Sequence, residues 1–590
     1  MTETAAFLGV ERSVRGNRWE IAEADERLGL AIAQRFDLPD IVGRLMAARG
    51  IGLDAVEDFL TPTLRRQFPD PARLQDMKAA AGRLAEAVRN GETIGIFGDY
   101  DVDGATSSAL LKRFFEAAGA AVEIYIPDRI AEGYGPNLPA LQKLQARGVR
   151  VAVTVDCGIT AFEPLEAAAS GGLEVIVVDH HVAEPRLPVA RAVVNPNRLD
   201  DDSGQGQLAA VGVAYLLVVA VNRALREAGW YAARPEPDLM QWLDLVALGT
   251  VCDVVPLTGV NRVLVTQGLK VMARRGNCGI AALADVGGVS EAPDAYHAGF
   301  VMGPRVNAGG RVGEAWLGAT LLATDDPAEA RGYAERLDRY NQERREIEAT
   351  CLEAAIEQVE RDGAHDGLVY ASCEGWHPGV IGIVAGRLRE RYNRPACVVA
   401  MENGVGKGSG RSVRGVDLGA AVLAARQSGL LINGGGHKMA AGFTVAADAE
   451  AEFRHFLAER IAADAGPGGI VPVLRLDGAL QGGAATIPLL QAVEALAPFG
   501  AGNPRPRFAL PACRIFKADV VGQNHVRCFI GGEGQGRLKA IAFRAVGEPL
   551  GDALLRAGAL PVHLAGQLRI DRWQGREDVQ LIIDDLAPVA

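Results

Sequence analysis

The sequence predicts an α/β protein of several domains: two α/β lobes joined by a long helix, and a small β-barrel at the C-terminal end. Three observations support this fold class. Short Val/Ile-rich runs alternate with helical patterns up to about residue 265, which is typical of βαβ units in a parallel sheet covered on both faces. A charged helical pattern then spans 327–362. Short strands separated by Gly-rich turns fill the last region.

Shifts in this pattern divide the chain into five parts, since 590 residues are too many for a single core. A Gly/Pro-rich break at 465–469 precedes the barrel. The predicted parts are an N-terminal helical segment (1–75), a parallel-sheet domain (76–265), a connecting region with an Arg/Gly motif and the long helix (266–365), a second α/β domain (366–465) and the barrel (470–590).

The elements of the first α/β domain follow in order. Residues 79–88 are helical in pattern, 93–97 form an apolar strand, 105–118 a second helix and 122–126 a second strand. Two further apolar runs end, like the first, at an acidic residue. Ligand-binding residues of parallel sheets lie just past the carboxyl ends of the strands, so we expect a functional site there.

Overall charge and cysteine content narrow the class of protein. The net charge is -12, so any nucleic-acid binding must come from local basic surface. The eight cysteines form no CxxC pair and predict buried thiols in a reducing compartment. The N-terminal residues do not resemble a signal peptide, and we find no apolar run of about 18 residues. We therefore expect a cytoplasmic protein that does not associate with membranes.

Acidic residues at the strand ends point to a metal centre. Asp101 and Asp103 follow the 93–97 strand, and Asp156 and His180 follow later strands. Carboxylates are the ligands that Mg²⁺ and Mn²⁺ prefer, and Mn²⁺ also accepts imidazole. On an extended segment, Asp101 and Asp103 would flank two ions; Asp156 would bridge them, and His180 and Asp253 would complete the second. Two ions about 4 Å apart suit phosphoester hydrolysis.

A single acid after a strand is more often a helix cap or a turn residue, and two adjacent histidines are often ordinary surface residues. The whole set in one sheet is much harder to explain in that way. Asp99 is expected to support the site or to cap the helix rather than to bind metal.

The motifs then resemble a known family. Residues 98–104, 156–158 and 179–181 resemble motifs of the DHH phosphoesterase superfamily, and 249–257 resembles its fourth motif. Within the superfamily the match is closest to the RecJ family, which are 5′→3′ exonucleases specific for single-stranded DNA. Related inorganic pyrophosphatases have a ligand His where this chain has Phe97, which speaks against that activity.

The resemblance implies which residues are catalytic. Two Mn²⁺ or Mg²⁺ ions would be held by five ligands, and His181 would contact the scissile phosphate. The implied ligands are Asp101, Asp103, Asp156, His180 and Asp253.

Several Arg- and Gly-containing segments are candidates for substrate binding. The segment 303–311 combines Arg305, Asn307 and Arg311 with what we interpret as a Gly-rich turn, although such a turn alone is more often plain surface. In the family this motif closes the catalytic lobe, with Arg305 as a substrate contact. After the strand at 122–126, Arg129 could pair with phosphate and Tyr134 could stack on a base. The resemblance implies that both bind the DNA end.

The second α/β domain carries three Gly-rich segments, at 375–382, 406–412 and 434–442, which we interpret as loops able to cradle phosphate. Tight packing of an α/β turn is the alternative for each one alone. In this order they resemble the DHHA1 domain. The resemblance implies that Ser409 and Arg411 bind the 5′-terminal phosphate and that His437 lies at the cleft between the lobes.

The C-terminal region supplies basic charge. Residues 501–580 contain 12 Lys/Arg and 7 Asp/Glu, a net of +5 (12 − 7). Most of the interleaved aromatic residues are expected in the barrel core, and the remaining pattern fits an OB-fold whose groove binds single-stranded DNA. The aromatic residues are Phe508, Phe516, Phe529, Phe543 and Trp573.

The sequence therefore predicts a metal-dependent exonuclease that degrades single-stranded DNA from its 5′ end to 5′-mononucleotides, in DNA repair and recombination. One alternative is an oligonucleotide or nucleotide phosphatase of the same superfamily. Another is a replication factor that has lost its metals and only binds single strands. The resemblance also implies single-strand-binding protein and a RecQ-type helicase as partners, and a monomer is the default oligomeric state.

Overall fold

The computed structural model describes residues 5–129, 131–362, 367–466, 469–531, 537–558, 560–573 and 576–589. The chain forms two compact units, which we describe separately. The central unit comprises 63–464 and 500–502, and the terminal unit comprises 1–62, 465–499 and 503–590. Pro467 and Gly468 of the predicted Gly/Pro break lie outside the described residues.

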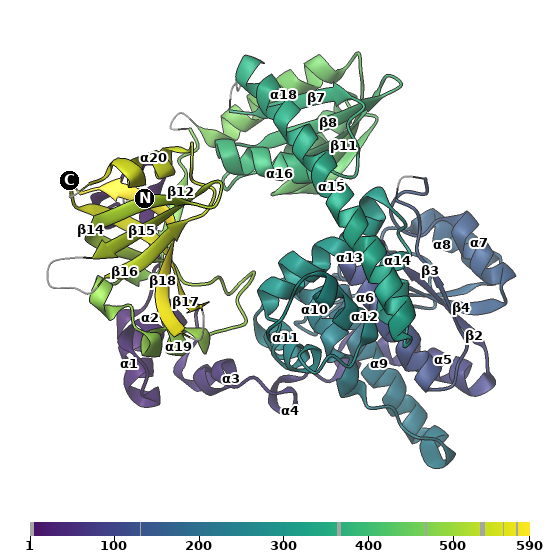
Figure 1. Cartoon of the computed structure of the whole chain (residues 1–590). Coiled ribbons are helices and arrows are strands. Elements are labelled where there is room, and N and C mark those ends of the chain that lie inside the picture. Colours follow the sequence, from purple (N-terminus) through teal and green to yellow (C-terminus); the bar gives the residue numbers. More distant parts are fainter. Residues whose placement is uncertain are drawn as a thin grey trace. The chain divides into compact units, whose positions relative to one another are not determined.

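The first part of the central unit is a five-stranded parallel sheet in the order β3-β2-β4-β5-β6 (Figure 1). Helices cover both faces, as the alternating pattern predicts: the core on one face includes α5, α6 and α9, and that on the other includes α7 and α8. The strands are β2 (Thr93–Gly98), β3 (Val122–Tyr125), β4 (Val149–Val155), β5 (Glu174–Val178) and β6 (Ala192–Val194). The helices are α5 (Met77–Asn90), α6 (Val102–Ala117), α7 (Leu138–Ala146), α8 (Phe162–Ser170) and α9 (Ala210–Glu227).

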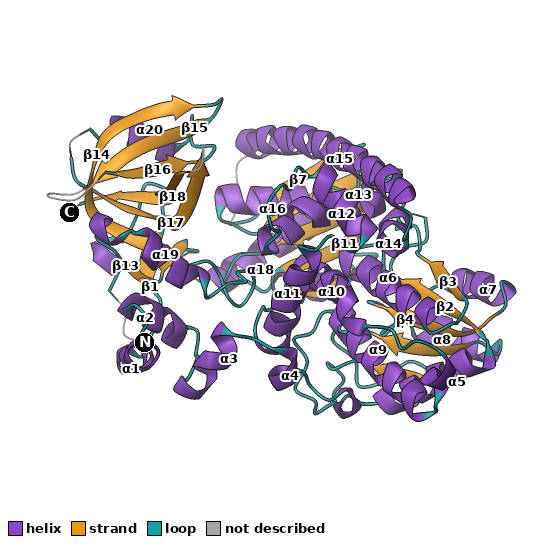
Figure 2. Cartoon of the chain, turned by 60° about the horizontal axis from the view of Figure 1, so that its bottom comes forward, coloured by secondary structure: helices purple, strands orange, loops and turns teal. Residues whose placement is uncertain are grey.

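A helical region follows the sheet and ends in α15 (Pro327–Asp362), the long helix that the charged pattern predicts (Figure 2). The segment 303–311 lies in α13 (Gly303–Val312), so its interpretation as a Gly-rich turn is wrong. Its Gly and Pro residues misled the prediction, although Pro304 sits in the first turn, where a helix tolerates it. The other elements are α4 (Leu64–Gln67), α10 (Leu243–Cys252), α11 (Gly259–Met272), α12 (Cys278–Val286), the π-helical turn η6 (His297–Met302) and α14 (Leu317–Ala323).

The second α/β part of the central unit has a mixed sheet in the order β10-β11-β9-β8-β7, in which only β7 and β8 are parallel among the described strands. The Gly-rich segments at 406–412 and 434–442 are largely strands rather than the expected loops. The strands are β7 (Val369–Glu374), β8 (Ala396–Glu402), β9 (Val405–Arg411), β10 (Asn433–His437) and β11 (Ala440–Ala446). The helices are α16 (Ile381–Tyr392), α17 (Leu418–Gln427) and α18 (Glu450–Ala465).

The terminal unit contains the expected OB-type barrel. Five strands close on themselves in the order β14-β15-β16-β18-β17, because β17 also pairs with β14. The barrel strands are β14 (Phe508–Val521), β15 (His525–Gly531), β16 (Leu538–Ala542), β17 (Val562–Trp573) and β18 (Arg576–Pro588). Around them lie α19 (Ile487–Glu494), α20 (Pro549–Arg556), β12 (Val473–Leu476) and β13 (Gly478–Ala479).

Residues 1–62 of the predicted N-terminal segment (1–75) belong to the terminal unit, and the segment is not purely helical. Its strand β1 (Arg18–Ile21) pairs in parallel with β12, and its helices pack on the barrel core. The fully buried Asp585 of β18 accepts hydrogen bonds from the Trp19 indole N–H at 3.1 Å and from the Asn17 amide at 2.9 Å. A short strand flanked by polar residues gave no sequence signal for this long-range pairing. The helices are α1 (Glu26–Phe36), α2 (Asp40–Ala48) and α3 (Val56–Leu60).

Across the described residues, every helix is too short or too polar to pass through a lipid bilayer.

Candidate metal centre

The predicted ligands converge where strands of the parallel sheet end. Asp99 and Asp101 follow β2, Asp156 follows β4, and His180 follows β5. Asp253 approaches from the C-terminal end of α10, where it caps the helix. Their potential ligand atoms form three overlapping groups, and within each group the atoms lie within 4.8 Å of one another. The groups are Asp156, His180 and His181; Asp103, His180 and Asp253; and Asp99, Asp101 and Asp156.

Asp101 and Asp103 belong to the start of a helix, so the expectation of an extended segment is wrong. Asp101 is the N-cap of α6, and its Oδ1 accepts the Gly104 N–H at 3.0 Å. The buried Asp103 accepts the N–H groups of Ala210 at 2.6 Å and Val211 at 2.8 Å, at the start of α9. The N-terminus of a helix stabilises a carboxylate, so the first N–H groups of α9 favour the ionised form of Asp103 and fix the orientation of its side chain.

The orientation of His180 leaves its outer nitrogen free for a cation. Its Nδ1 lies 3.0 Å from the Leu208 carbonyl oxygen and donates to it, which places the lone pair on Nε2. Nε2 lies 3.3 Å from Asp156 Oδ1 and 3.6 Å from Asp253 Oδ2. These three atoms are buried and have no hydrogen-bond partner among the described residues. Because unsatisfied buried acceptors are costly, the donor set fits a divalent cation.

Asp179 orients the His-His pair. It is fully buried, and its Oδ1 accepts the backbone N–H groups of His180 at 2.7 Å and His181 at 3.1 Å. The same oxygen lies 2.7 Å from Nδ1 of His181, while Oδ2 accepts the Ile159 N–H at 3.1 Å. Burial acts to raise the pKa of Asp179, but the bonds from His181 and Ile159 leave that pKa below its usual value. Asp179 was not among the predicted site residues, although it stands directly before the two histidines.

The carboxylates repel one another in the absence of a cation. Burial, and then the neighbouring Asp101, raise the pKa of Asp99 to about 8 and that of Asp253 to about 7. Burial likewise raises the pKa of Asp156 and of Asp103 well above the usual range, with further contributions from nearby carboxylates. Bound cations reverse this balance by favouring the ionised forms. Asp99 also has a buried Oδ1 without a hydrogen-bond partner among the described residues, and one of its oxygens lies within 4.8 Å of Asp101 and Asp156 oxygens.

Tyr134 supports the backbone of Asp156. The Tyr134 hydroxyl donates to the Asp156 carbonyl oxygen at 3.1 Å, and its ring meets His181 edge-on at 6.1 Å. Asp156 has a φ of +60°, a left-handed conformation that costs a non-glycine residue energy and is concentrated at functional sites. The Tyr134 hydroxyl therefore holds a strained ligand, while its half-exposed ring remains accessible.

A cluster of guanidinium groups lies beside the acids. Burial, together with the nearby Arg129, Arg344 and Arg411, lowers the pKa of Arg311 to about 10, with Asp101 opposing the shift. Arg311 donates to the Gly379 carbonyl oxygen at 3.0 Å, and Arg129 lies 5.1 Å from the ring centre of Tyr100. Positive groups that outnumber their counter-ions in a buried place favour an anionic ligand. Arg344, from α15, was missed because it is one of many charges on that helix.

Ser409 and Arg411 lie together at the start of α16. The Arg411 guanidinium donates to the Ser409 hydroxyl at 3.1 Å. A Cβ added at Gly382, in the first turn of α16, would lie 3.0 Å from both side chains, so that only glycine leaves this corner open. Two polar side chains and the N–H groups of a helix N-terminus are the usual surroundings of a bound phosphate.

The strand register places His437 on the same sheet face as these two residues. Ser409 pairs with Gly442, which pairs with Gly435. Arg411 pairs with Ala440, which pairs with His437, and residues two apart on a strand share a face. A Cβ at Gly435 or Gly442 would meet no atom of the described residues within 4 Å. Gly435 and Gly442 therefore form an open floor, bounded by the side chains of Ser409, Arg411 and His437.

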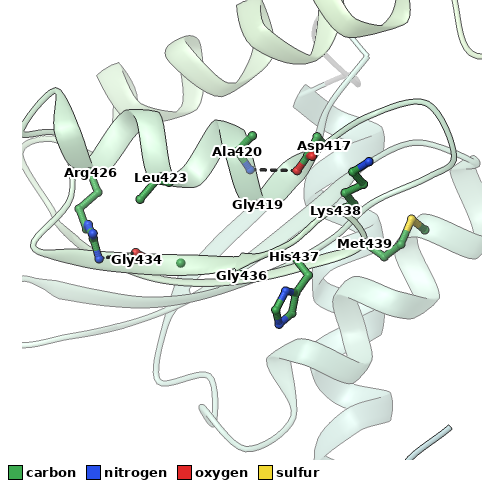
Figure 3. A pocket seen from close by; sticks show the side chains of 11 residues that line it. Asp417, Gly419, Ala420, Leu423, Arg426, Gly434, Gly436, His437, Lys438 and Met439 are labelled. Atoms are coloured by element: carbon green, nitrogen blue, oxygen red, sulfur yellow. Dashed lines mark hydrogen bonds between the residues drawn. The ribbon is translucent and has the colours of Figure 1, made fainter. Parts of the chain in front are cut away.

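Figure 3 shows the other side of β10. A cavity of about 680 Å³ lies between α17 and this strand, and Arg426 reaches from the helix to the Gly434 carbonyl oxygen at 3.1 Å. The His437 ring points to the side of the strand away from α17, which agrees with the register.

Arg305 and Asn307, two of the predicted substrate residues, both lie on α13. The buried Arg305 donates to Asp338 of α15 at 2.9 Å and to the Val301 carbonyl oxygen at 2.6 Å, so its guanidinium holds α13 against α15. This geometry speaks against the expected substrate contact. Asn307 lies half-buried on the same helix.

The expectation that most of the barrel aromatics lie in its core is wrong: among the described side chains only Phe508 is buried, and Phe529 is half-buried. Phe508 is fully buried, whereas Phe516 and Phe543 are exposed on the surface. Lys517, Phe529 and Lys539 occupy neighbouring register positions on β14, β15 and β16. Lys539 is, however, paired with Asp578 at 3.0 Å, so part of the basic excess is neutralised. The Trp573 side chain lies outside the described residues.

Comparisons with known proteins agree with this architecture. Family models match three parts of the chain: the DHH family, N-terminal domain, at 93–250; the DHHA1 domain at 365–463; and the RecJ OB domain at 476–585. The single-stranded-DNA-specific exonuclease RecJ of Bacillus subtilis is 34% identical over 97% of this chain and 71% of its own length. That of Dickeya dadantii is 37% identical, over 94% and 96%.

The chain belongs to the RecJ family. The crystal structure of RecJ in complex with Mn²⁺ from Thermus thermophilus matches this chain with a TM-score of 0.81 at 30% identity, over 97% of this chain and 79% of that one. A Mg²⁺ complex from the same organism gives a TM-score of 0.75 at 29% identity, over 97% and 78%. The family resemblance and the fold class expected from the sequence are confirmed.

Proposed function

We propose that this chain is a metal-dependent exonuclease that hydrolyses single-stranded DNA in the 5′→3′ direction to 5′-mononucleotides, in DNA repair and recombination. One observation carries the proposal. Asp156 Oδ1, His180 Nε2 and Asp253 Oδ2 are buried, close together and without a partner among the described residues. The RecJ relatives named above, which are exonucleases by name, support the choice of substrate.

Asp101, Asp103, Asp156, His180 and Asp253 are the proposed ligands of two Mn²⁺ or Mg²⁺ ions. Such a pair of ions, when bound, supplies Lewis-acid stabilisation of the phosphate oxygens and activation of a water molecule. The protein contributes the rigid arrangement of these ligands: α9 fixes Asp103, and the Leu208 carbonyl fixes the tautomer of His180.

His181 is the proposed contact to the scissile phosphate. Its Nδ1 is held at 2.7 Å by Asp179, so Nε2 is the nitrogen that remains for the substrate. The hydrogen bond to Asp179 raises the pKa of His181, against the effect of burial, and so favours the protonated ring. A proton on Nε2 would then stabilise the charge that develops on a phosphate oxygen.

The 5′-terminal phosphate is proposed to bind at Ser409 and Arg411, with Arg129 and Arg311 close by. From there the nucleotide would lie along the face that contains Gly442 and Gly435 and ends at His437. At the two glycines the missing Cβ atoms leave space for a sugar or a base at van der Waals distance. Tyr134 offers a half-exposed ring near His181 as an end-binding contact, and Asn307 stays a proposed substrate contact, whereas Arg305 is proposed to position α13.

The test compares degradation of long single strands, duplexes and dinucleotides, with Mn²⁺ and with EDTA. The proposal predicts rapid release of mononucleotides from 5′-phosphorylated single strands, little cleavage of blunt duplexes and no activity in EDTA. A preference for dinucleotides would instead indicate the phosphatase alternative, and single-strand binding without cleavage would indicate an inactive replication factor. Asp101→Ala should abolish cleavage and keep single-strand binding; full activity of that variant would refute the assignment.

Partners and oligomeric state belong to the same proposal. We infer single-strand-binding protein and a RecQ-type helicase as partners, a monomeric enzyme and a cytoplasmic location. The support for the partners is the family resemblance.

A further inference from the structure

The turn between α12 and α13 exposes a pair of stacked aromatic rings. Tyr296 directly precedes η6, and Phe300 lies within it. Their ring centres are 5.3 Å apart and their planes are inclined by 26°. The two residues are 53% and 69% exposed. Two adjacent exposed rings leave apolar surface in contact with water. A partner that covered them would gain the free energy of burying that surface.

Two exposed carboxylates flank His297, whose ring lies 5.8 Å from that of Tyr296. Asp294 lies 2.7 Å from Nδ1 of His297, and Glu291 lies 3.7 Å from Nε2 of the same imidazole. Asp285, earlier in the same stretch, pairs with Arg275, so Glu291 and Asp294 are the acids of this surface. The surface is therefore aromatic and acidic, in contrast to the arginine cluster beside the metal ligands.

The acidic surroundings decide which ligand fits. A DNA strand would bring its phosphates towards the exposed carboxylates of Glu291 and Asp294, which is repulsive, even though its bases could stack on the rings. An arginine side chain satisfies both features, because its guanidinium stacks on an aromatic face and pairs with a carboxylate. We propose that the surface formed by Glu291, Asp294, Tyr296 and Phe300 docks a basic, arginine-containing segment of a partner protein.

The surface packs against the end of α10, next to the proposed ligand Asp253. The Cys252 thiol, on the residue before the ligand Asp253, lies 3.4 Å from the Ala298 carbonyl oxygen of η6. A Cβ at Gly303 would lie 2.4 Å from the sulfur of Cys252, so η6 and the start of α13 press directly on the end of α10. A partner bound here would therefore contact the segment that packs against the end of α10.

The test uses the full chain and a fluorescent, acetylated 12-residue peptide with four arginines separated by Gly and Ser. A matched peptide carries citrulline, the neutral isostere, at the four positions. We expect the arginine peptide to bind more tightly, and Phe300→Ala to weaken it about 3- to 10-fold, as expected for loss of a cation–π contact beside a carboxylate. Phe300→Leu should weaken it similarly, since it keeps apolar area but removes the aromatic face.

Further variants separate the alternatives. Glu291→Gln should weaken the arginine peptide, whereas Phe516→Ala, which removes an exposed ring on the barrel, should not. Nuclease activity should be unchanged in all the η6 variants. Equal binding of the citrulline peptide, or unchanged binding by Phe300→Ala, would overturn the proposal. A loss of single-stranded DNA affinity in Phe300→Ala would assign the surface to DNA, and self-association abolished by Phe300→Ala would assign it to a second copy of the chain.

Discussion

Replacing Asp179 by Asn tests how much the metal centre depends on a residue that binds no metal. Oδ1 of Asp179 accepts three hydrogen bonds, from both histidine backbones and from Nδ1 of His181, and Oδ2 accepts the Ile159 N–H at 3.1 Å. An Asn side chain can keep its oxygen towards the histidines. Its NH₂ group then faces the Ile159 N–H, so a donor opposes a donor in a fully buried place.

The size of the effect follows from these contacts. Leaving the buried Ile159 N–H unsatisfied costs about 1–3 kcal/mol, and loss of the charge weakens the remaining bonds by about 1–2 kcal/mol in total. We therefore expect the free energy of unfolding of the first α/β part to fall by roughly 2–5 kcal/mol. Because a neutral amide oxygen holds the His181 ring and the two histidine N–H groups less firmly than a carboxylate, Mn²⁺ affinity or activity should fall about 10- to 100-fold.

Thermal unfolding and calorimetric titration with Mn²⁺ measure the two effects on the same preparation. Asp202→Asn, at an exposed carboxylate 23 residues along the chain, is the matched control and should change neither. If Asp179→Asn melts like the unmodified protein and binds Mn²⁺ within about twofold of it, the inferred role of Asp179 is refuted.

Three further predictions concern other parts of the fold. Burial raises the pKa of Asp244 to about 6, so its ionisation opposes folding above that pH; Asp244→Asn should stabilise the protein by up to about 3 kcal/mol at pH 8 and by almost nothing below pH 4, in urea unfolding at both values. Gly442→Val should weaken single-stranded DNA binding at least tenfold, or about 1.4 kcal/mol, in fluorescence polarisation, with little change in melting temperature. A variant that does not fold, or one with unchanged affinity, would contradict the open floor. Arg305→Ala should lower the melting temperature through loss of its bond to Asp338, at a cost of about 1–3 kcal/mol, and keep the turnover of the folded enzyme at low temperature; an early loss of turnover would instead support the substrate contact expected from the sequence.

The effect of pH on stability through Asp244 follows from the raised pKa of this residue in the folded state. The folded state holds the proton more tightly than the unfolded state, whose pKa is near 3.8. Between pH 3.8 and about 6 the folded state binds more protons, so stability falls as the pH rises through this window. The penalty is complete above about pH 6, which is where Asn gives its full benefit.

The sequence was sufficient to predict the features that have local patterns. The alternation of apolar runs and helices predicted the parallel sheet, and the charged pattern predicted α15 with both of its ends. The acids at strand ends predicted the cluster, because parallel strands bring their carboxyl ends to one edge of the sheet. Asp253 lies at a helix end instead, and there the family resemblance supplied what periodicity could not.

The remaining features depend on long-range contacts or on the context of glycine. The bond from Leu208 that sets the tautomer of His180, and the pairing of β1 with β12, join residues that no local pattern relates. Glycine favours turns in general, but in β9 and β10 it occurs in strands, where a missing Cβ keeps one face open and lets helices approach the other. Arg305 shows the same limit for charge, since a guanidinium that suits phosphate also suits Asp338.

Anomalous diffraction at the manganese edge, from crystals of this chain soaked in Mn²⁺, would test the proposed two-metal centre. We expect two peaks about 4 Å apart. One should contact His180 Nε2 together with Asp103 or Asp253, and Asp156 should reach both. A site without bound manganese, or manganese held elsewhere by other carboxylates, would contradict it.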